Sequence, residues 1–307
     1  MKIAVIFTGG TIGSRTNDKW ITVDATTKYD LLKHYENDKD ITFKAFSPYN
    51  ILSENLSANE LNLLQKEIGD RLTETYDGII VTHGSDTLQY SSTAVEMAFG
   101  NCEIPIIFVC ADYPLDNEKS NGYPNFQCAV EFIRSKIANG VFVSYKNDDE
   151  IITSIHIPSK ILMHNELNAN IYSIDRTPFA EYNGEFRINN TKYPEYGKTK
   201  IVNYTTESKI LVVHSYPGQD YSYSLENIKA ILFKPYHSAT LNTSNEKFID
   251  FCKKTSEMNV PMFVSGPESD TNYESTKIFN DLNINILPYS TFISAYMKLW
   301  AEISKDN

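Results

Sequence analysis

Two short segments of the chain combine glycines with hydroxyl and carboxyl side chains. Residues 8–13 read TGGTIG, and residues 82–87 read THGSDT. Glycines allow the backbone to approach a ligand closely, and a hydroxyl becomes a nucleophile once a neighbouring base removes its proton. The two segments therefore predict a site at which hydroxyl groups carry out the chemistry.

Each segment also has an alternative interpretation. The first differs from a dinucleotide-binding G-x-G-x-x-G turn because Thr8 stands where a glycine is needed, and no lysine follows to make a P-loop. The second is typical of a helix start, so we expect one of the residues 85–87 to cap a helix. A cap needs only one such residue, and two hydroxyl-bearing segments in one sheet favour a catalytic site.

The base for such a hydroxyl is expected to be a carboxylate with a lysine rather than a histidine. His83 precedes a glycine at a strand end, where a histidine is more often structural than catalytic. Four further histidines form no Ser/His/Asp order: His156, His164, His214 and His237. Asp86 paired with a buried lysine is the expected proton relay, because desolvation lowers the pKa of a lysine. Without an H-E-x-x-H motif or a Cys/His cluster, no metal is expected.

Strand-like and helix-like patterns alternate through the first half of the chain. Strands are predicted at residues 3–7, 41–46, 79–81, 104–110 and 141–143. Helices are predicted at residues 27–35, at 61–72 behind a capping box at 57–60, at 90–99 and at 125–138. This alternation predicts an α/β fold with a mainly parallel sheet covered by helices on both faces. Ligands of such sheets bind beyond the carboxyl ends of the strands, where both segments lie.

A change of pattern divides the chain. Residues 189–207 lack periodicity and are predicted to be a linker between an N-terminal catalytic α/β domain (1–188) and a smaller C-terminal α/β domain (208–307). In the second domain we predict strands at 210–214, 230–233 and 261–264, and helices at 245–254 and 291–303.

The composition restricts partners and compartment. With 39 acidic and 28 basic residues the net charge is −11, so neither nucleic acid nor an anionic membrane surface is an expected partner. The longest apolar run, 104–111, is too short to span a bilayer, and the apolar start ends before a secretory signal would be complete. Four cysteines without C-x-x-C spacing predict free thiols. We therefore expect a cytoplasmic protein.

Residues 8–12 and 78–88, with Ser53-Glu54-Asn55 between them, resemble the signature segments of the bacterial-type L-asparaginase family. The resemblance extends over nearly the whole chain, and the lack of a signal peptide is similar to the cytoplasmic, type I-like branch. It implies an amidohydrolase acting on linear amides, without a cofactor. Thr11 would attack the side-chain amide carbon of L-asparagine, giving an acyl-enzyme and releasing ammonia. Subunits of this family form homodimers, often paired into homotetramers.

The resemblance also implies roles for individual residues. Ser85 stands where the family usually has a second threonine, and Asp86 matches the aspartate that holds the substrate α-ammonium and joins the proton relay. Lys160 matches the family lysine by its distance from the strand at 141–143. The implied catalytic residues are thus Thr11, Ser85, Asp86 and Lys160. The implied substrate-binding residues are Ser53, Glu54, Ser85, Asp86 and Ala111, the last through its backbone carbonyl.

Three positions depart from the family pattern. Ser85 lacks the threonine methyl that fixes the hydroxyl rotamer. Trp20 or Ile21 occupies the place of a lid tyrosine that hydrogen-bonds the nucleophile, and Asp112 follows Ala111 where the family often has an arginine.

These departures keep two alternatives open besides the hydrolase. One is a non-catalytic amino-acid-binding or sensor protein. The other is a glutaminase or amidotransferase subunit that releases ammonia from glutamine for tRNA-bound glutamate. That subunit usually has an extra N-terminal domain, whereas the first segment here starts at residue 8, so we expect the hydrolase.

Overall fold

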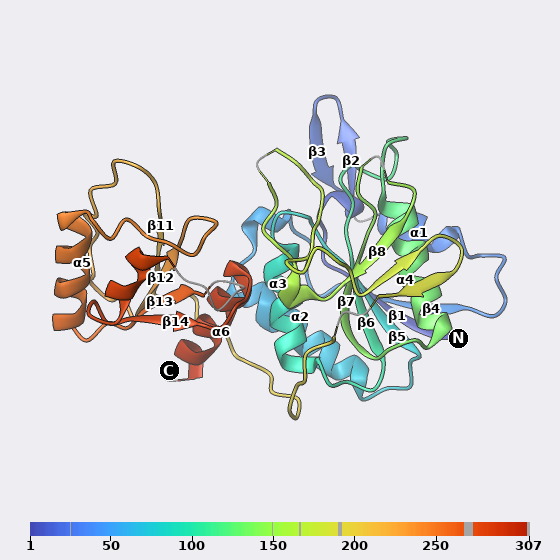
Figure 1. Cartoon of the computed structure of the whole chain (residues 1–307). Helices are drawn as coiled ribbons and strands as arrows, with labels where there is room; N and C mark the ends of the chain where they lie inside the picture. The colour runs from blue at the N-terminus through green and yellow to red at the C-terminus, as the bar shows by residue number, and fades with distance from the viewer. Residues whose placement is uncertain (25, 149, 166, 190–191, 267–272, 306–307) are drawn as a thin grey trace. The chain divides into compact units, whose positions relative to one another are not determined.

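The computed structural model describes all residues except 25, 149, 166, 190–191, 267–272 and 306–307 (Figure 1). The chain forms two compact units, Met1–Asn203 and Tyr204–Asn307. Of the predicted linker, residues 190–191 lie outside the described residues. In the part of the chain that is described, no helix is both long and apolar enough to cross a membrane.

The first unit contains an eight-stranded sheet in the order β10-β9-β8-β7-β6-β5-β1-β4. Its parallel strands are β1 (Lys2–Phe7), β4 (Thr42–Phe46), β5 (Gly78–Thr82), β6 (Pro105–Val109) and β7 (Gly140–Tyr145). The antiparallel strands are β8 (Thr153–His156), β9 (Ala180–Tyr182) and β10 (Phe186–Ile188). The predicted mainly parallel α/β sheet is thereby confirmed.

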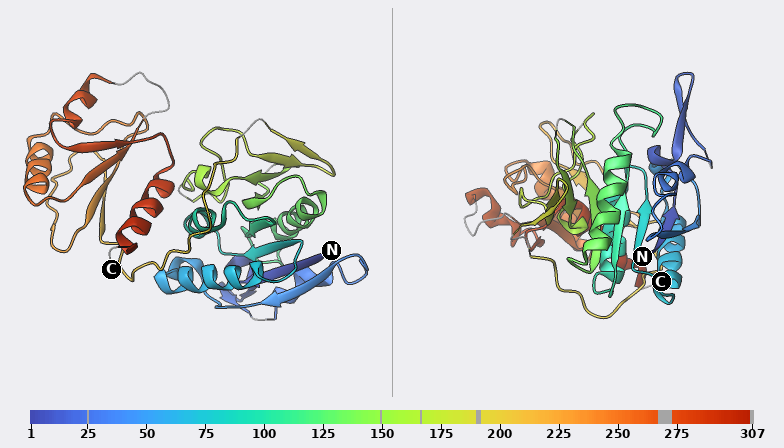
Figure 2. Two further views of the ribbon diagram at one scale, coloured as in Figure 1. Left: turned by 90° about the horizontal axis from the view of Figure 1, so that it is seen from below. Right: turned by 90° about the vertical axis from the view of Figure 1, so that its right-hand side faces the viewer.

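Helices cover both faces of this sheet (Figure 2). Side chains alternate along β1, so Ile3 and Val5 join one core cluster and Ala4 and Ile6 the other. The first cluster includes buried side chains of α1 (Lys28–Lys33) and α4 (Gly122–Ser135). The second includes those of α2 (Ala58–Leu72) and α3 (Leu88–Phe99). Each fully buried aliphatic or aromatic side chain stabilises the fold by about 1.5–3 kcal/mol.

The order of the strands creates a switch point. The chain leaves β1 for the edge strand β4, then crosses to β5 on the opposite side of β1, and continues outward to β6 and β7. The connections from β1 and β5 therefore run in opposite directions. In open parallel sheets such a point leaves a crevice beyond the carboxyl ends of the two strands.

Some local elements differ from the predictions. Helix α4 ends at Ser135, because Lys136 adopts a left-handed conformation (φ 54°) and terminates it before the expected Asn139-Gly140. The capping box at Ser57 and Glu60 is confirmed at the start of α2. In the first unit, two sets of strands were not predicted: the hairpin of β2 (Ser14–Asn17) with β3 (Trp20–Val23), and β8–β10.

The end of the first unit is fastened by aromatic side chains. A Cβ on Gly140 would lie 2.6 Å from the hydroxyl of Tyr193, and one on Gly100 would lie 2.3 Å from the ring of Tyr196. The Val141 N–H donates to the Tyr193 hydroxyl at 2.8 Å. Gln65 donates to the carbonyl of Val202 at 3.0 Å. Much of the predicted linker therefore packs onto the first unit.

The second unit has its own four-stranded parallel sheet in the order β11-β12-β13-β14. Its strands are β11 (Ile210–His214), β12 (Ala230–Lys234), β13 (Met262–Ser265) and β14 (Ile284–Leu287), and its helices are α5 (Glu246–Glu257) and α6 (Phe292–Lys305). Phe233, Phe248 and Phe251 lie in its core. This unit is the smaller α/β domain expected from the sequence, with β14 as an addition.

Candidate active site

The loop after β1 is tied to its neighbours on both sides. The Thr8 hydroxyl donates to the carbonyl of Thr82 at the end of β5, at 2.7 Å. The Gly10 N–H donates to the carbonyl of Ile51, in the segment after β4, at 2.8 Å. The chain then turns through a short 3₁₀ helix, Thr11–Gly13, on which Thr11 is partly exposed. The loop thus presents Thr11 at the switch point of the sheet.

The two glycine segments touch through their backbones. A Cβ on Gly10 would lie 2.3 Å from the Cα of Gly84, closer than real Cβ atoms come to other atoms. Gly10 also has φ 75°, a conformation that side chains disfavour. Thr11 follows the first of these glycines and Ser85 follows the second, so both segments meet at one place.

Ser53 joins the same contact. It begins the 3₁₀ helix Ser53–Asn55 and is 5% exposed. A Cβ on Gly84 would lie 2.4 Å from the Ser53 hydroxyl oxygen. The Thr87 hydroxyl donates to the Ser53 carbonyl at 2.9 Å. Glu54 follows Ser53 and is exposed. We name the group Gly10, Ser53 and Gly84 the site floor.

The start of α3 differs from the expectation. Thr87 occupies the N-cap position, but its side chain makes no capping hydrogen bond. Its hydroxyl instead donates a hydrogen bond to the Ser53 carbonyl. The prediction that one of the residues 85–87 caps the helix with its side chain is therefore wrong for Thr87, which occupies the N-cap position. Asp86 is exposed and Ser85 partly exposed beside this helix start.

Buried groups lie behind the floor. His83 is 2% exposed, and burial lowers its pKa to about 4, so the ring is neutral at neutral pH. Its Nδ1 lies 2.8 Å from the carbonyl of Gly84, which places the ring N–H on that nitrogen. Ala111 is completely buried after β6. Burial, followed by the charges of Asp112 and Asp86, raises the pKa of the adjacent Cys110 thiol.

Lys160 lies on a short 3₁₀ helix that packs against α3. It ends the 3₁₀ helix Pro158–Lys160, and its Nζ pairs with Asp175 at 2.5 Å. The carboxylate of Glu96 on α3 accepts from the Ser159 N–H at 2.6 Å and fixes this short helix. The structure therefore gives the Lys160 ammonium a carboxylate partner outside the two glycine segments.

One site neighbour was not predicted from the sequence. The Nε2 of His164 lies 3.2 Å from the carbonyl oxygen of Ser85. His164 reaches this position on an extended segment that pairs with residues near 172, and no sequence pattern indicated that pairing. No motif could have identified it.

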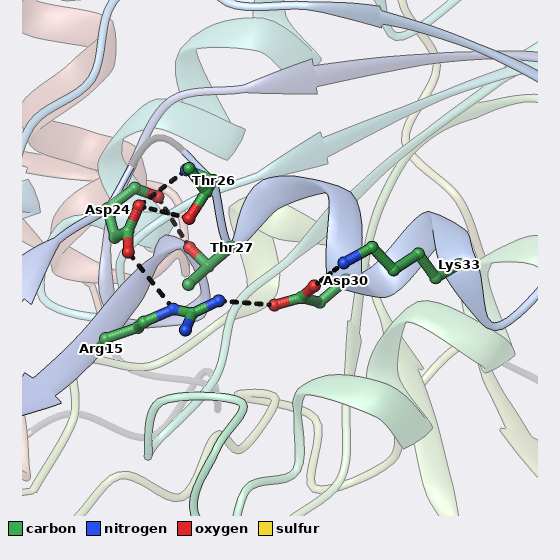
Figure 3. Close-up of polar contacts among 6 residues, drawn as sticks. All are labelled: Arg15, Asp24, Thr26, Thr27, Asp30 and Lys33. Carbon is green, nitrogen blue, oxygen red and sulfur yellow. Dashed lines mark hydrogen bonds and ion pairs between the residues drawn. The ribbon is translucent and has the colours of Figure 1, made fainter.

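A hairpin of β2 and β3 follows Thr11. Trp20 on β3 is 75% exposed and Ile21 is 44% exposed. At the base of the hairpin the Arg15 guanidinium pairs with Asp24 at 3.2 Å and with Asp30 of α1 at 3.3 Å (Figure 3). Hydrogen bonds from the Thr26 hydroxyl and N–H, and then the Arg15 charge, hold the pKa of Asp24 below its ordinary value. The hairpin base is thus fastened by surface charges.

Metal binding has no support among the described residues. No three His, Cys, Asp or Glu side chains gather there in an arrangement that could hold a metal ion. The described site consists of hydroxyls, carboxylates and backbone groups at the ends of β1, β5 and β6 and in the segment after β4. Together these features define an α/β protein with a hydroxyl-bearing site at the switch point of a parallel sheet.

Comparison with known proteins gives the family. Residues 2–193 match the family profile described as Asparaginase, N-terminal, and the chain belongs to the asparaginase family. The fold is similar to the thermostable L-asparaginase of Thermococcus kodakarensis, with TM-score 0.83 and 18% identity, covering 99% of this chain and 93% of the other. It is also similar to L-asparaginase I of Vibrio cholerae, with TM-score 0.79 and 20% identity, covering 100% and 93%.

A curated relative carries a different name. It is a subunit of the glutamyl-tRNA(Gln) amidotransferase of Methanococcus maripaludis, 28% identical over 227 residues, which cover 71% of this chain and 54% of the relative. The match therefore spans about half the length of that relative. The family profile thus establishes the family.

Proposed function

We propose that this protein hydrolyses the side-chain amide of L-asparagine to L-aspartate and ammonia. The observation that carries the proposal is the backbone contact between Gly10 and Gly84, beside the Ser53 hydroxyl. Because of this contact, a nucleophile at Thr11 and the Ser85–Asp86 turn would face one small substrate. The switch point of the sheet is the ordinary ligand position of such folds.

The proposed reaction has two halves. The Thr11 hydroxyl oxygen bonds to the amide carbon while its proton passes through the relay to the amide nitrogen, and the C–N bond breaks to release ammonia. Water then attacks the ester, and L-aspartate leaves as the Thr11 hydroxyl is regenerated. An amide is a poor electrophile, so an activated nucleophile and oxyanion donors are needed. Backbone N–H groups at Gly84–Asp86 are the proposed oxyanion donors.

The substrate is a zwitterion, and the proposed binding groups match its charges. Asp86 and Glu54, both exposed carboxylates next to the floor, would hold the α-ammonium group. The Ser53 hydroxyl would donate to the α-carboxylate. The buried Ala111 carbonyl would accept from the substrate amide. By the same resemblance, we propose a cytoplasmic homodimer or homotetramer that needs no cofactor.

A second candidate function is ammonia release from glutamine as part of an amidotransferase. It is favoured by the name of the Methanococcus maripaludis relative, which belongs to a glutamyl-tRNA(Gln) amidotransferase. Asparagine and glutamine differ by one methylene, which is worth only about 1–3 kcal/mol of discrimination. The assay must therefore compare the two substrates directly.

The deciding experiment is ammonia release by the whole chain from L-asparagine and L-glutamine, with Thr11→Ala as the control. We expect turnover of asparagine, and in Thr11→Ala a loss of at least about 10³-fold in kcat, while asparagine still binds measurably by calorimetry. Turnover of glutamine alone would support the second candidate. Binding without turnover in the wild type would support a sensor protein, and full activity in Thr11→Ala would remove Thr11 from the mechanism.

A further inference from the structure

His164 is bound to the turn that carries Ser85 and Asp86. Its Nε2 lies 3.2 Å from the Ser85 carbonyl oxygen, and its Nδ1 lies 3.3 Å from the carbonyl oxygen of Asn170. The Ser85 carbonyl also accepts from the Leu88 N–H, in the first turn of α3, at 3.3 Å. A carbonyl oxygen has two lone pairs and can accept both hydrogen bonds. The imidazole therefore adds a second donor to a carbonyl that also begins the helix.

The segment that carries His164 is held in an extended pairing. The Ile174 N–H donates to the Lys160 carbonyl at 2.7 Å, and the Leu162 N–H donates to the Tyr172 carbonyl at 2.9 Å. Beyond these backbone bonds, the contact between His164 and Asn170 is made by the imidazole ring, whose Nδ1 faces the Asn170 carbonyl oxygen. At about 3.3 Å per residue, four residues of extended chain separate Lys160 from His164 by roughly 13 Å. The pairing thus directs His164 and Lys160 to different neighbours.

The partners of the two basic side chains differ in kind. The Lys160 ammonium is neutralised by the Asp175 carboxylate, which lies one residue beyond the paired segment. Both ring nitrogens of His164 face carbonyl oxygens. A neutral imidazole carries one N–H and donates to one of them at a time, and the shorter of the two contacts is from Nε2 to Ser85. Among the described hydrogen bonds, His164 is thus a basic side chain that reaches the Ser85–Asp86 turn.

We propose that His164 is a positioning residue for the Ser85–Asp86 turn, whereas the family resemblance had suggested Lys160 as the basic residue of the site, in a catalytic role. Its Nε2–H fixes the Ser85 carbonyl, and with it the peptide plane between the hydroxyl and the carboxylate of the proposed site. The catalytic consequence of this inference rests on the proposed function. The positioning itself does not, so the two can be tested separately.

The test compares two polar replacements of one side chain in the whole chain. The amide nitrogen of glutamine reaches about as far as Nε2, whereas that of asparagine reaches only as far as Nδ1. His164→Gln can thus keep the donor to Ser85, and His164→Asn cannot. Lys160→Gln represents the competing assignment, and His34→Ala, an exposed histidine at the end of α1, is the control.

Amide hydrogen exchange of residues 84–88 measures the positioning without any ligand. We expect exchange about tenfold faster in His164→Asn than in the wild type, and within about threefold of it in His164→Gln and His34→Ala. We also expect kcat for asparagine to fall about tenfold in His164→Asn and to recover in His164→Gln, with the melting temperature within about 2 °C throughout.

Several outcomes would overturn the inference. Unchanged exchange at 84–88 in His164→Asn removes the positioning role, whatever the activity. Faster exchange with full activity removes its catalytic consequence. Loss of kcat in Lys160→Gln but not in His164→Asn removes the catalytic consequence for His164 and supports Lys160 as the catalytic basic residue. A wild-type protein that releases no ammonia refutes the proposed function, and the exchange comparison then decides the role of His164 alone.

Discussion

Thr11 stands between the site floor, through Gly10, and the β2–β3 hairpin, which begins at Ser14, and these two regions are built in opposite ways. The floor is made of buried backbone, with Gly10, Ser53 and Gly84 so close that an added Cβ has no room. The hairpin is exposed along most of its length, and its base is fastened by the Arg15 ion pairs. Packing fixes atoms to fractions of an ångström, whereas exposed ion pairs contribute little to stability. The comparison indicates a rigid floor beside an adaptable hairpin.

The largest expected effect comes from filling the floor. Gly10→Ala puts a Cβ 2.3 Å from the Gly84 Cα on a backbone with φ 75°. We expect the free energy of unfolding to fall by about 3 kcal/mol or more, and ammonia release to be lost. Gly13→Ala is the matched control, because a Cβ there meets nothing within 4 Å. Equal stability of the two variants in urea unfolding would contradict a rigid floor.

Acid should weaken the floor before the hairpin. Burial lowers the pKa of His83, and that of His156 on β8, from 6.5 to about 4. Below pH 6.5 these histidines therefore bind protons in the unfolded chain but not in the native chain. The free energy of unfolding should therefore fall between pH 6.5 and 4, by up to about 3 kcal/mol for each histidine.

The pKa of Asp24 at the hairpin base is shifted in the same direction, but it acts in a lower pH window. Because the pKa of Asp24 is lowered from 3.8, its carboxylate keeps the ion pair with Arg15 between pH 6.5 and 4 and loses it only at lower pH. Urea unfolding between pH 7 and 4.5 measures the slope of stability against pH. His83→Asn should reduce that slope, and the exposed His237→Asn should leave it unchanged. A slope unaffected by His83→Asn would assign the acid sensitivity to other groups.

A smaller effect is expected at the hairpin base. Arg15→Ala removes the ion pairs with Asp24 and Asp30, in which the Arg15 side chain is 49% exposed. We expect a loss of at most about 1 kcal/mol in global stability. Hydrogen exchange in residues 14–24 should be several-fold faster, and KM for asparagine higher by about threefold. Arg134→Ala, which removes a surface ion pair with Asp38 on another part of the first unit, should change neither exchange nor KM.

The smallest expected effect is at Trp20, which is 75% exposed. Trp20→Tyr supplies the hydroxyl that the family resemblance places in the lid. We expect stability to change by less than about 0.5 kcal/mol and kcat to rise by about threefold, as one hydrogen bond would allow. Trp20→Phe lacks the hydroxyl and should not show the rise. The same kcat in both variants would exclude a hydroxyl effect at this position.

Much of the fold could be predicted because its strands are continuous apolar runs. Strands β1, β5 and β6 are buried on both faces of the sheet, and such runs have a clear sequence pattern. The short strands β8–β10 and the polar hairpin have no such pattern, since their pairing depends on tertiary contacts. Helix α4 ended early because Lys136 took the left-handed conformation expected of a glycine.

The candidate site divides in the same way. Thr11 and Ser85 could be singled out because each follows a glycine in a recognisable segment after a strand, whereas Ser53 was expected only from the family resemblance. The neighbours of Lys160 and His164 depend on how residues 160–174 pair, which composition and spacing do not determine. Side chains that reach a site from an irregular segment therefore need the three-dimensional structure.

The tyrosines that pack against Gly100 and Gly140 determine where a stable fragment of the first unit can end. A fragment ending at residue 188 would lack Tyr193 and Tyr196. The spaces beside Gly140 and Gly100 would then be empty, and the Val141 N–H would lose the Tyr193 hydroxyl as its acceptor. A fragment ending at Asn203 retains both rings and the hydrogen bond between Gln65 and Val202. A truncation placed by the composition of the connecting segment would thus remove part of the first unit.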